Sequence, residues 1–324
     1  MKVPLMKENL LNYLMKHARQ IISKQQLLTL FPENFEQSFA DIQRDYYLKE
    51  SESSVIFYPE VPLSVARITE QLLGAWPTLT VTWHASLSST NTVMKEQIQT
   101  GVLSNNEPHL LITDAQTAGR GRLGRSFISD SYNGLYMSLF IPFKLTTGDL
   151  PPFTLIAAAA LTQALKSLDN FDIKIKWVND LYLNRKKVAG ILTETTTDYE
   201  TNQINGVIVG TGINISAFPE QIPTELRDKM GTLFEPGKET ITREQLINAY
   251  LTQFSLLLND KTKQYYPIYC DHSLILGKDI SFHKDGQTIT GQAVKIFEDG
   301  RLLVTLPDLS TITLLAGEIS LQSY

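Results

Sequence analysis

The hydrophobic and polar positions of the chain follow two periods, and the period changes along its length. Near the N-terminus, apolar side chains recur every three or four residues, as in amphipathic helices. An alternating hairpin with a polar turn comes next. The elements expected there are helices over residues 6–16, 24–30 and 34–45 and strands over residues 46–49 and 55–58. Three short helices and a hairpin are typical of a winged helix-turn-helix, which we predict for residues 1–62.

From residue 63 onward, helical stretches alternate with strands that are separated by short turns. Helices are expected over residues 63–73, 92–99, 153–168 and 242–258. Strands are expected over residues 79–84, 109–113, 135–141, 173–177, 188–192, 203–209 and 212–215. Consecutive hairpins exclude an all-parallel doubly wound sheet, so we predict an α+β domain with a mainly antiparallel sheet over residues 63–270.

The last part of the chain, residues 271–324, is rich in short alternating stretches. Between residues 278 and 321 the pattern predicts several strands, separated by turns at Asp285-Gly286, Asp299-Gly300 and Pro307-Asp308. Short strands with close turns are typical of a small β-barrel, which we predict here.

Composition limits the class of protein. Of the 324 residues, 43% are hydrophobic and 19% are charged, as in a globular protein with sizeable cores. The longest apolar run, residues 155–165, is too short to span a bilayer, and residues 1–20 lack a signal-peptide core. We therefore expect a cytoplasmic protein with no membrane partner. One cysteine, Cys270, excludes an internal disulfide framework, and five scattered histidines offer no spacing for a structural metal.

Charge restricts any contact with nucleic acid to a local surface. The net charge of -5 opposes binding by the whole chain, because such binding depends on lysine and arginine at phosphates. The third expected helix carries Glu33, Glu36, Asp41 and Asp45 against Arg44 alone. The sequence therefore leaves two roles open for residues 1–62: DNA binding, and a structural or dimer-modulating role.

The densest chemistry lies in an arginine loop, residues 116–125, in which Gly119 to Arg125 hold three arginines and three glycines in seven residues. Glycines allow a tight backbone and arginines offer guanidinium groups to an anion, so we predict phosphate handling, with a plain basic loop as the alternative. The loop contains G-x-G-x-x-G, but strands and turns follow it instead of the helix that a dinucleotide-binding motif needs. Arginine-glycine RNA-binding segments differ because they are long, disordered repeats.

Two further stretches have two interpretations each. Ser89, Thr90 and Asn91 either cap the following helix or line a pocket for a ligand that donates and accepts hydrogen bonds. Lys187 begins an apolar strand, where it is either an edge charge in solvent or a buried cation that awaits a negative ligand.

Five segments, taken together, resemble the biotin-protein ligases in order and spacing. They are Ser89-Thr90-Asn91, Gly119-Arg120-Gly121-Arg122-Leu123-Gly124-Arg125, Lys176-Trp177-Val178-Asn179-Asp180, Lys187-Val188-Ala189-Gly190-Ile191-Leu192 and Gly317-Glu318-Ile319-Ser320-Leu321. The resemblance covers residues 63–324. Residues 1–62 look like the winged-helix domain of the bifunctional ligase/repressor members.

This resemblance implies a catalytic domain related to class II aminoacyl-tRNA synthetases and lipoate ligases, with a mixed sheet and helices, followed by an SH3-like barrel. Members of the family join biotin to ATP with Mg²⁺, forming biotinyl-5′-adenylate and pyrophosphate. They then pass biotin to one lysine of a biotin carboxyl carrier protein. Regulatory members bind operator DNA and form homodimers when liganded, so these partners are expected here on the same ground.

The resemblance also implies roles for single residues. The expected biotin-binding residues are Ser89, Thr90, Asn91, Gln116, Arg120, Gly121, Arg122 and Lys187, of which Arg120, Arg122 and Lys187 also serve catalysis. The expected ATP-binding residues are Arg122, Lys176, Trp177, Asn179, Asp180 and Asn214. A biotin carboxylate that attacks the α-phosphate of ATP brings two anions together, so cations must offset their repulsion.

Two residues depart from the family pattern. Val178 stands where the family usually has proline, and Phe127 replaces a tryptophan just past the arginine loop. Two rival functions are a lipoate or octanoate ligase of the same superfamily and a biotin-responsive DNA-binding regulator that has lost catalysis. The presence of Lys187 and the three loop arginines argues against that loss.

Overall fold

The computed structural model of the chain describes residues 3–18, 20–32, 34–45, 47–58, 63–129, 134–143, 152–197, 203–216, 224–235, 238–284, 286–315 and 319–321. Some sequence features fall outside these residues. They are Glu33 of the acidic helix, the linker at residues 59–62, Asp285 of a predicted turn, and Gly317 and Glu318 of the last family segment.

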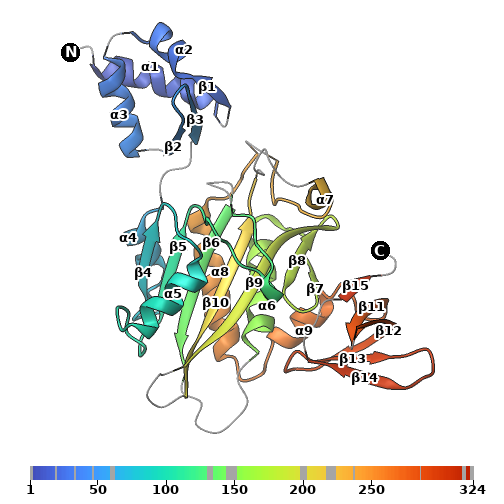
Figure 1. Ribbon diagram of the computed structural model, residues 1–324. Coiled ribbons are helices and arrows are strands. Elements are labelled where there is room, and N and C mark those ends of the chain that lie inside the picture. Colours follow the sequence, from blue (N-terminus) through green and yellow to red (C-terminus); the bar gives the residue numbers. More distant parts are fainter. Residues whose placement is uncertain are drawn as a thin grey trace.

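The N-terminal part folds into three helices and a three-stranded sheet (Figure 1). Its elements are α1 (Val3–Lys16), β1 (Ile21–Ser23), α2 (Lys24–Leu30), α3 (Phe35–Asp45), β2 (Tyr47–Glu50) and β3 (Ser54–Tyr58). The strand order is β1-β3-β2, with antiparallel pairs throughout. The helices and the β2–β3 hairpin confirm the predicted elements. The sequence pattern missed β1 because three residues are too few to show a period.

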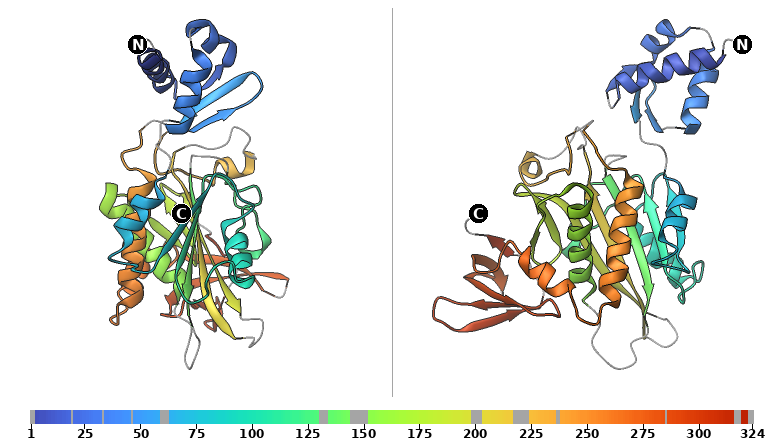
Figure 2. Two further views of the ribbon diagram at one scale, coloured as in Figure 1. Left: turned by 90° about the vertical axis from the view of Figure 1, so that its left-hand side faces the viewer. Right: turned by 180° about the vertical axis from the view of Figure 1, so that it is seen from behind.

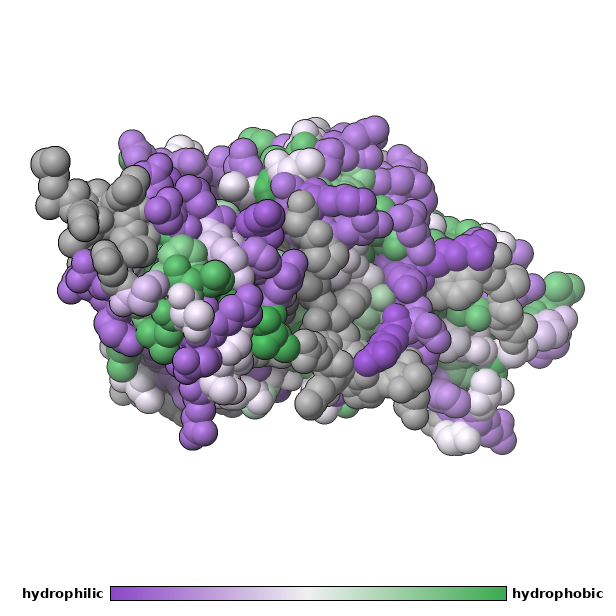
Figure 3. Space-filling model, turned by 90° about the horizontal axis from the view of Figure 1, so that it is seen from above, coloured by the Kyte–Doolittle hydropathy of each residue, from purple (hydrophilic) through white to green (hydrophobic). Residues whose placement is uncertain are grey.

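A separate apolar core holds the N-terminal part together. Leu10, Leu14, Leu27, Ile42 and Phe57 are fully buried in it. Seen from above, the molecule is mostly hydrophilic, but hydrophobic residues gather in a patch on the left, over the N-terminal part (Figure 3). The exposed apolar residues of this part are Met15, Ile21, Leu28 and Leu30.

The central part is built on a seven-stranded mixed sheet of order β4-β5-β6-β10-β9-β8-β7. Its strands are β4 (Thr80–His84), β5 (His109–Thr113), β6 (Gly134–Pro142), β7 (Lys174–Lys176), β8 (Asp180–Leu183), β9 (Lys186–Thr197) and β10 (Ile204–Asn214). Its helices are α4 (Val65–Leu72), α5 (Thr90–Gln99), α6 (Phe153–Asp169), α7 (Thr224–Arg227), α8 (Arg243–Asn259) and α9 (Tyr265–Asp271). Among the described strand pairs of this sheet, β4 and β5 alone are parallel, so the predicted mainly antiparallel character is confirmed.

Helices cover both faces of this sheet (Figures 1 and 2). The long helices α6 and α8 pack on one face, where Val207 and Val209 of β10 join the main core. Helix α5 covers part of the other face, where Ile208 packs against Met94 and Ile98. Alternate residues of β10 therefore face opposite layers. Among the described residues, no helix is both long enough and apolar enough to cross a membrane.

Strand β10 differs from its prediction. The sequence predicted two strands, because glycines between residues 209 and 212 read as a turn. The structure has one continuous strand, in which Gly210 pairs with Ser138 and Gly212 with Tyr136 of β6. These glycines keep the strand free of side chains, which matters for the pocket described below. The short helices α7 and α9 were also not predicted.

The C-terminal part forms a five-stranded antiparallel sheet of order β14-β13-β12-β11-β15. The strands are β11 (Asp279–Lys284), β12 (Gln287–Ile296), β13 (Leu302–Thr305), β14 (Thr311–Leu314) and β15 (Ile319–Leu321). Within the described residues, β14 and β15 remain the edges, so the predicted barrel is not closed. This sheet shares the main core with the central part, and the indole N–H of Trp177 donates to the carbonyl oxygen of Gly300 at 2.8 Å.

Candidate functional site

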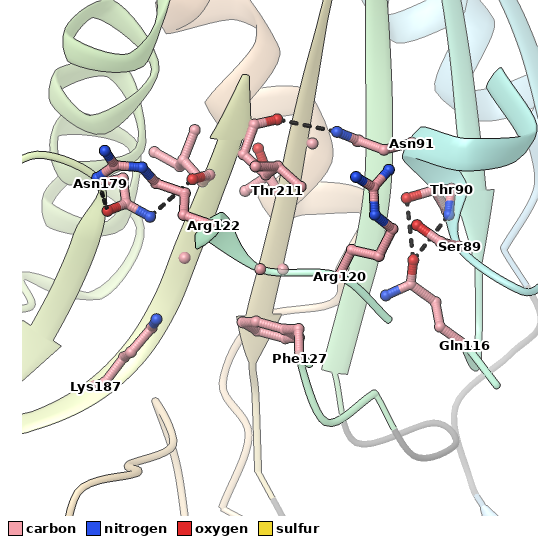
Figure 4. Close-up of a pocket in the computed structure, with 16 residues that line it drawn as sticks. Ser89, Thr90, Asn91, Gln116, Arg120, Arg122, Phe127, Asn179, Lys187 and Thr211 are labelled. Carbon is pink, nitrogen blue, oxygen red and sulfur yellow. Dashed lines mark hydrogen bonds between the residues drawn. The ribbon is translucent and has the colours of Figure 1, made fainter. Parts of the chain in front are cut away.

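A pocket opens on the α5 side of the central sheet, where β9 and β10 meet the arginine loop (Figure 4). Its lining residues are Ser89, Thr90, Asn91, Gln116, Arg120, Gly121, Arg122, Phe127, Asn179, Lys187, Gly190, Ile191, Leu192, Gly210, Thr211 and Gly212. A wider groove of about 500 Å³ continues past Arg120 and Arg122 to the N-terminus of α6 and to Gly300. Every residue that the sequence predicted for biotin therefore lines one pocket.

Three glycines form the floor of the pocket. Gly190 of β9 and Gly212 of β10 are direct partners in the sheet, and Gly210 lies two residues earlier. A Cβ atom at Gly210 would overlap the carboxamide of Asn91, and one at Gly212 would come within 2.6 Å of the Phe127 ring. The bare strands thus let these two side chains lie directly against the backbone.

Asn91 joins α5 to the sheet through its whole carboxamide. Its Nδ2 donates to the carbonyl oxygen of Leu192 at 3.1 Å and to Oε2 of Glu194 at 2.8 Å. The hydroxyl of Ser138 donates to its Oδ1 at 2.6 Å. Since both amide hydrogens already have protein acceptors and the residue is only 3% exposed, Asn91 mainly fixes the wall of the pocket.

Thr90 and Gln116 form a polar pair on the same wall. The Oε1 atom of Gln116 accepts from the backbone N–H of Thr90 at 2.8 Å and from its hydroxyl at 3.3 Å, while Nε2 donates to Ser129 Oγ at 2.7 Å. Ser89 occupies the N-cap position of α5 without a side-chain cap bond. The capping alternative is therefore not realised by the Ser89 side chain, and the cluster faces the pocket.

Arg120 forms a fork with Glu194 of β9. Its Nη2 lies 3.2 Å from Oε1 and its Nη1 3.4 Å from Oε2 of that carboxylate. The Nη1 atom also lies 3.4 Å from the hydroxyl oxygen of Thr92. The arginine loop is thus tied to both β9 and α5.

The guanidinium group of Arg122 donates a hydrogen bond to a neutral side chain, that of Asn179. Its Nη1 donates to Oδ1 of Asn179 at 3.1 Å, and Nδ2 of Asn179 donates to the carbonyl oxygen of Ile191 at 2.9 Å. The backbone N–H of Ile191 returns a bond to the Asn179 carbonyl at 3.0 Å. The turn between β7 and β8 is thereby pinned to β9, with one arginine of the loop above it. Arg122–Gly124 form a short 3-10 turn and not the α-helix that a dinucleotide-binding motif needs.

Lys187 faces the pocket, so it is not an edge charge in solvent. Its Nζ lies 2.7 Å from Oδ1 of Asp180 and 5.9 Å from the centre of the Phe127 ring. The lysine is half-buried between a carboxylate and an aromatic face. Both contacts hold the lysine side chain where an anionic ligand can reach it.

Four predicted ATP-binding residues do not line this pocket: Lys176, Trp177, Asp180 and Asn214. Asp180 nevertheless contacts Lys187, which does line it. Trp177 is buried and faces the C-terminal sheet, while Nδ2 of Asn214 donates to the carbonyl oxygen of Gly231 at 3.1 Å. Lys176 is half-buried on β7 beside Ile175, on the strand face that its alternation predicted. The peptide bond between Trp177 and Val178 is cis.

A buried tyrosine supports the Asn179 turn from behind. The hydroxyl of Tyr269 donates to the carbonyl oxygen of Val178 at 3.0 Å. Burial raises the pKa of Tyr269 well above its ordinary value, against a smaller opposite effect of Arg122. The phenol therefore stays protonated and keeps donating to this turn.

Glu194 and Ser138 are site residues that the sequence did not single out. Glu194 lies two residues after the segment Lys187–Leu192, but its role depends on facing Asn91 and Arg120 across the fold. Only the sheet register, which places Glu194 opposite Ile208 and on the α5 side, could have found it. In the part of the chain that the structure describes, no group of three or more His, Cys, Asp or Glu side chains could hold a metal ion.

Comparisons with known proteins agree with this geometry. A family model described as the biotin/lipoate A/B protein ligase family matches residues 83–214. The bifunctional ligase/repressor BirA of Bacillus subtilis (strain 168) is 34% identical over 228 residues, which are 68% of this chain and 68% of that protein. The protein of the same name from Escherichia coli (strain K12) is 31% identical over 147 residues, 45% of this chain and 44% of that protein.

A solved structure covers a similar share of the fold. It is the biotin protein ligase from Aquifex aeolicus in complex with biotin and ATP, with a TM-score of 0.61 and 29% identity. The match covers 76% of this chain and 99% of that chain.

Proposed function

The chain belongs to the biotin-protein ligase family, and from this premise we propose that it joins biotin to ATP and transfers biotin to a lysine of a biotin carboxyl carrier protein. One observation carries the proposal: three cations, Arg120, Arg122 and Lys187, surround a single polar pocket. Arg122 and Lys187 contact protein acceptors that an incoming anion can replace, while Glu194 holds Arg120.

The first step needs cations because it brings two anions together. A biotin carboxylate oxygen forms a bond to the α-phosphorus of ATP, and the bond from that phosphorus to the pyrophosphate oxygen breaks. Lys187, released from Asp180, pairs with the carboxylate. Arg120 and Arg122 offset the charge that builds up on the phosphoryl oxygens.

The second step needs protection from water. The ε-amine of the carrier lysine attacks the acyl carbon of biotinyl-5′-adenylate, the bond from that carbon to the phosphate oxygen breaks, and AMP leaves. Arg120, Gly121 and Arg122 of the arginine loop lie over the pocket and keep water from the mixed anhydride until the carrier arrives.

The polar wall favours biotin over lipoate. The ureido ring of biotin both donates and accepts hydrogen bonds, which suits the hydroxyls of Ser89 and Thr90 and the amide of Gln116. The dithiolane ring of lipoate offers only weak acceptors, so it would add no comparable hydrogen bonds to this wall. Asn91 serves biotin by holding this wall in place.

For the nucleotide, Arg122, Asn179 and Asp180 stand closest to the pocket. ATP arrives with Mg²⁺, which is typically held by one or two carboxylates plus substrate phosphates. Asp180, once Lys187 has turned to biotin, is the carboxylate that suits this ion. We assign Lys176, Trp177 and Asn214 to placing ATP from further out, Trp177 by fixing the turn that carries Asn179.

We further propose three domains: a winged helix-turn-helix over residues 1–62, a catalytic domain over 63–270 and an SH3-like domain over 271–324. The separate N-terminal core supports the first boundary. The core shared by the other two parts indicates that they fold as one unit. A cytoplasmic location and a liganded homodimer remain predictions.

A second function, repression, is proposed for the N-terminal domain. Its three helices and hairpin support operator binding, while the exposed Glu36 of α3 opposes it and favours a structural or dimer-modulating role. A gel-shift titration at low salt against the gene's own promoter region decides between them. No shift at micromolar protein would rule out the operator role.

The ligase proposal is tested by biotin-dependent exchange of pyrophosphate into ATP, with Mg²⁺ and with lipoate in parallel. We expect exchange with biotin alone. Exchange with lipoate alone would assign the chain to lipoate ligases. No exchange with either acid, by folded protein that still binds biotin, would leave a regulator without catalysis.

A further inference from the structure

Glu194 is the one carboxylate that contacts both the arginine loop and α5 among the described residues. It projects from β9 on the α5 side of the sheet, opposite Ile208 of β10. Its side chain is 18% exposed, which is low for a glutamate. One oxygen accepts from Asn91 at 2.8 Å, and the pair of oxygens receives the Arg120 fork at 3.2 and 3.4 Å.

The two partners of Glu194 depend on it to different degrees. Asn91 is buried and keeps bonds to Ser138 and Leu192 even without Glu194. Arg120 is 47% exposed, and within the described part of the chain its guanidinium has one weaker contact besides Glu194, to the Thr92 hydroxyl at 3.4 Å. Loss of the carboxylate charge would therefore leave α5 in place and release the arginine.

We propose that Glu194 is a positioning residue of the ligase: its carboxylate holds Arg120, and with it the arginine loop, closed over the biotin pocket. The role rests on the proposed function. Glu194 does not line the biotin pocket itself; it lines the adjoining groove and acts through Arg120. A bidentate guanidinium–carboxylate pair suits this task because it fixes orientation as well as distance.

The test uses Glu194→Gln in the full-length protein. The glutamine can still accept from Asn91 but no longer offers a charged partner to Arg120. We expect trypsin to cleave after Arg120 about tenfold faster in ligand-free protein, and the bound biotinyl-5′-adenylate to dissociate about tenfold faster, as for the loss of a charged hydrogen bond. Glu298→Gln is the matched control, since Glu298 pairs with Lys263 at 2.6 Å on the surface.

A double variant shows whether Glu194 acts through Arg120 or whether its replacement loosens the whole site. If Glu194 acts through Arg120, then Arg120→Ala with Glu194→Gln should release adenylate no faster than Arg120→Ala alone. The proposal would be overturned if the double variant released adenylate faster than Arg120→Ala by the same factor that Glu194→Gln shows in the parent. It would also be overturned if Glu194→Gln released adenylate, and was cleaved by trypsin after Arg120, at the same rates as the parent.

Two further measurements keep the test decisive. Should Glu194→Gln fail to fold, Arg120→Lys breaks the same fork from its exposed side, and parental adenylate retention in that variant would contradict the proposal. Should the parent form no adenylate from biotin, the proposed function fails, and the cleavage rate alone then decides whether Glu194 holds the loop.

Discussion

The ammonium group of Lys187 and the carboxylate of Asp180 lie 2.7 Å apart, on the neighbouring strands β9 and β8. In the reaction proposed above, the carboxylate of biotin would take the contact that Asp180 makes here. The pair orients Lys187 without ligand, so that binding would exchange one carboxylate partner for another. Such preorganisation reduces the cost of ordering a flexible lysine when the ligand arrives.

Replacing Lys187 should therefore weaken biotin binding. We expect Lys187→Ala to lower biotin affinity by roughly 10- to 100-fold, because a charge-assisted hydrogen bond is lost and Asp180 is left facing the biotin carboxylate. Titration calorimetry with biotin measures this. Lys186→Ala is the control, since it removes the same charge from the exposed neighbouring position. An unchanged affinity in Lys187→Ala would remove the residue from the biotin site.

Replacing Arg122 should affect the adenylate more than biotin. In Arg122→Gly the Asn179 turn loses its contact with the arginine loop, so the cover of the pocket opens more often. We expect biotinyl-5′-adenylate to leave at least about tenfold faster, at nearly unchanged biotin affinity. Rapid dilution into excess unlabelled ligand measures the release. Arg185→Gly is a suitable control, because that exposed turn residue has a φ of 65°, which glycine adopts freely. Parental retention in Arg122→Gly would show that the loop assignment is wrong.

The glycine floor gives a steric prediction. In Gly210→Ala the new methyl group overlaps the Asn91 carboxamide, which is also held by Ser138, Leu192 and Glu194. We expect a loss of about 1–3 kcal/mol in the free energy of unfolding, together with weaker biotin binding. Gly74→Ala should cost neither, because a Cβ at Gly74 meets no atom within 4 Å. Equal behaviour of the two variants would contradict the close contact.

The sequence predicted the residues of the pocket better than the contacts between them. Motif order placed Ser89, Gln116, Arg120 and Lys187 in one site, and they do line one pocket. A sequence motif, however, does not determine the register in which its strand pairs with its neighbours. Whether Glu194 faces α5 or α6 depends on a shift of one residue in β9, which no pattern of polar positions fixes in a strand covered on both faces.

Two errors in the fold have the same origin. Glycines in β10 were interpreted as a turn, because glycine usually marks one, yet here they clear space for Asn91 and Phe127. Alternation in the C-terminal part predicted strands correctly but not their closure, which depends on pairing between β14 and β15 at opposite ends of the order. Local pattern determines elements, while long-range pairing determines sheets.

The junction between α8 and α9 should respond to acid. The backbone N–H of Gln264, followed by the hydroxyl and N–H of Thr262, donates to Asp260 and lowers the pKa of its carboxyl. A lowered folded-state pKa means that this stabilisation is complete above the unfolded value and disappears as the pH falls through the folded value. A carboxyl-detected NMR titration should give Asp260 a midpoint below that of an unfolded reference. A midpoint at or above the reference would contradict these hydrogen bonds.

The ion pair of Arg243 and Asp114 should stabilise the site from behind. Both side chains are almost fully buried, their nearest atoms lie 2.5 Å apart, and Asp114 directly follows β5 on the way to Gln116. We expect Arg243→Ala to cost about 3–5 kcal/mol, because it leaves an uncompensated buried carboxylate. Urea unfolding followed by tryptophan fluorescence measures this, since Trp76, Trp83 and Trp177 all lie in the central part.

Arg67 offers a matched control at the same end of α8. It pairs with Glu244 at 3.0 Å, but its side chain is 55% exposed. Arg67→Ala should cost only about 0–1 kcal/mol, as for other exposed ion pairs. The contrast between the two variants tests burial as the cause, because the type of charge lost is the same. If Arg243→Ala proved no more costly than Arg67→Ala, burial of the ion pair would not be the cause of its stabilisation, and the link from Asp114 to the Gln116 wall would carry little stability.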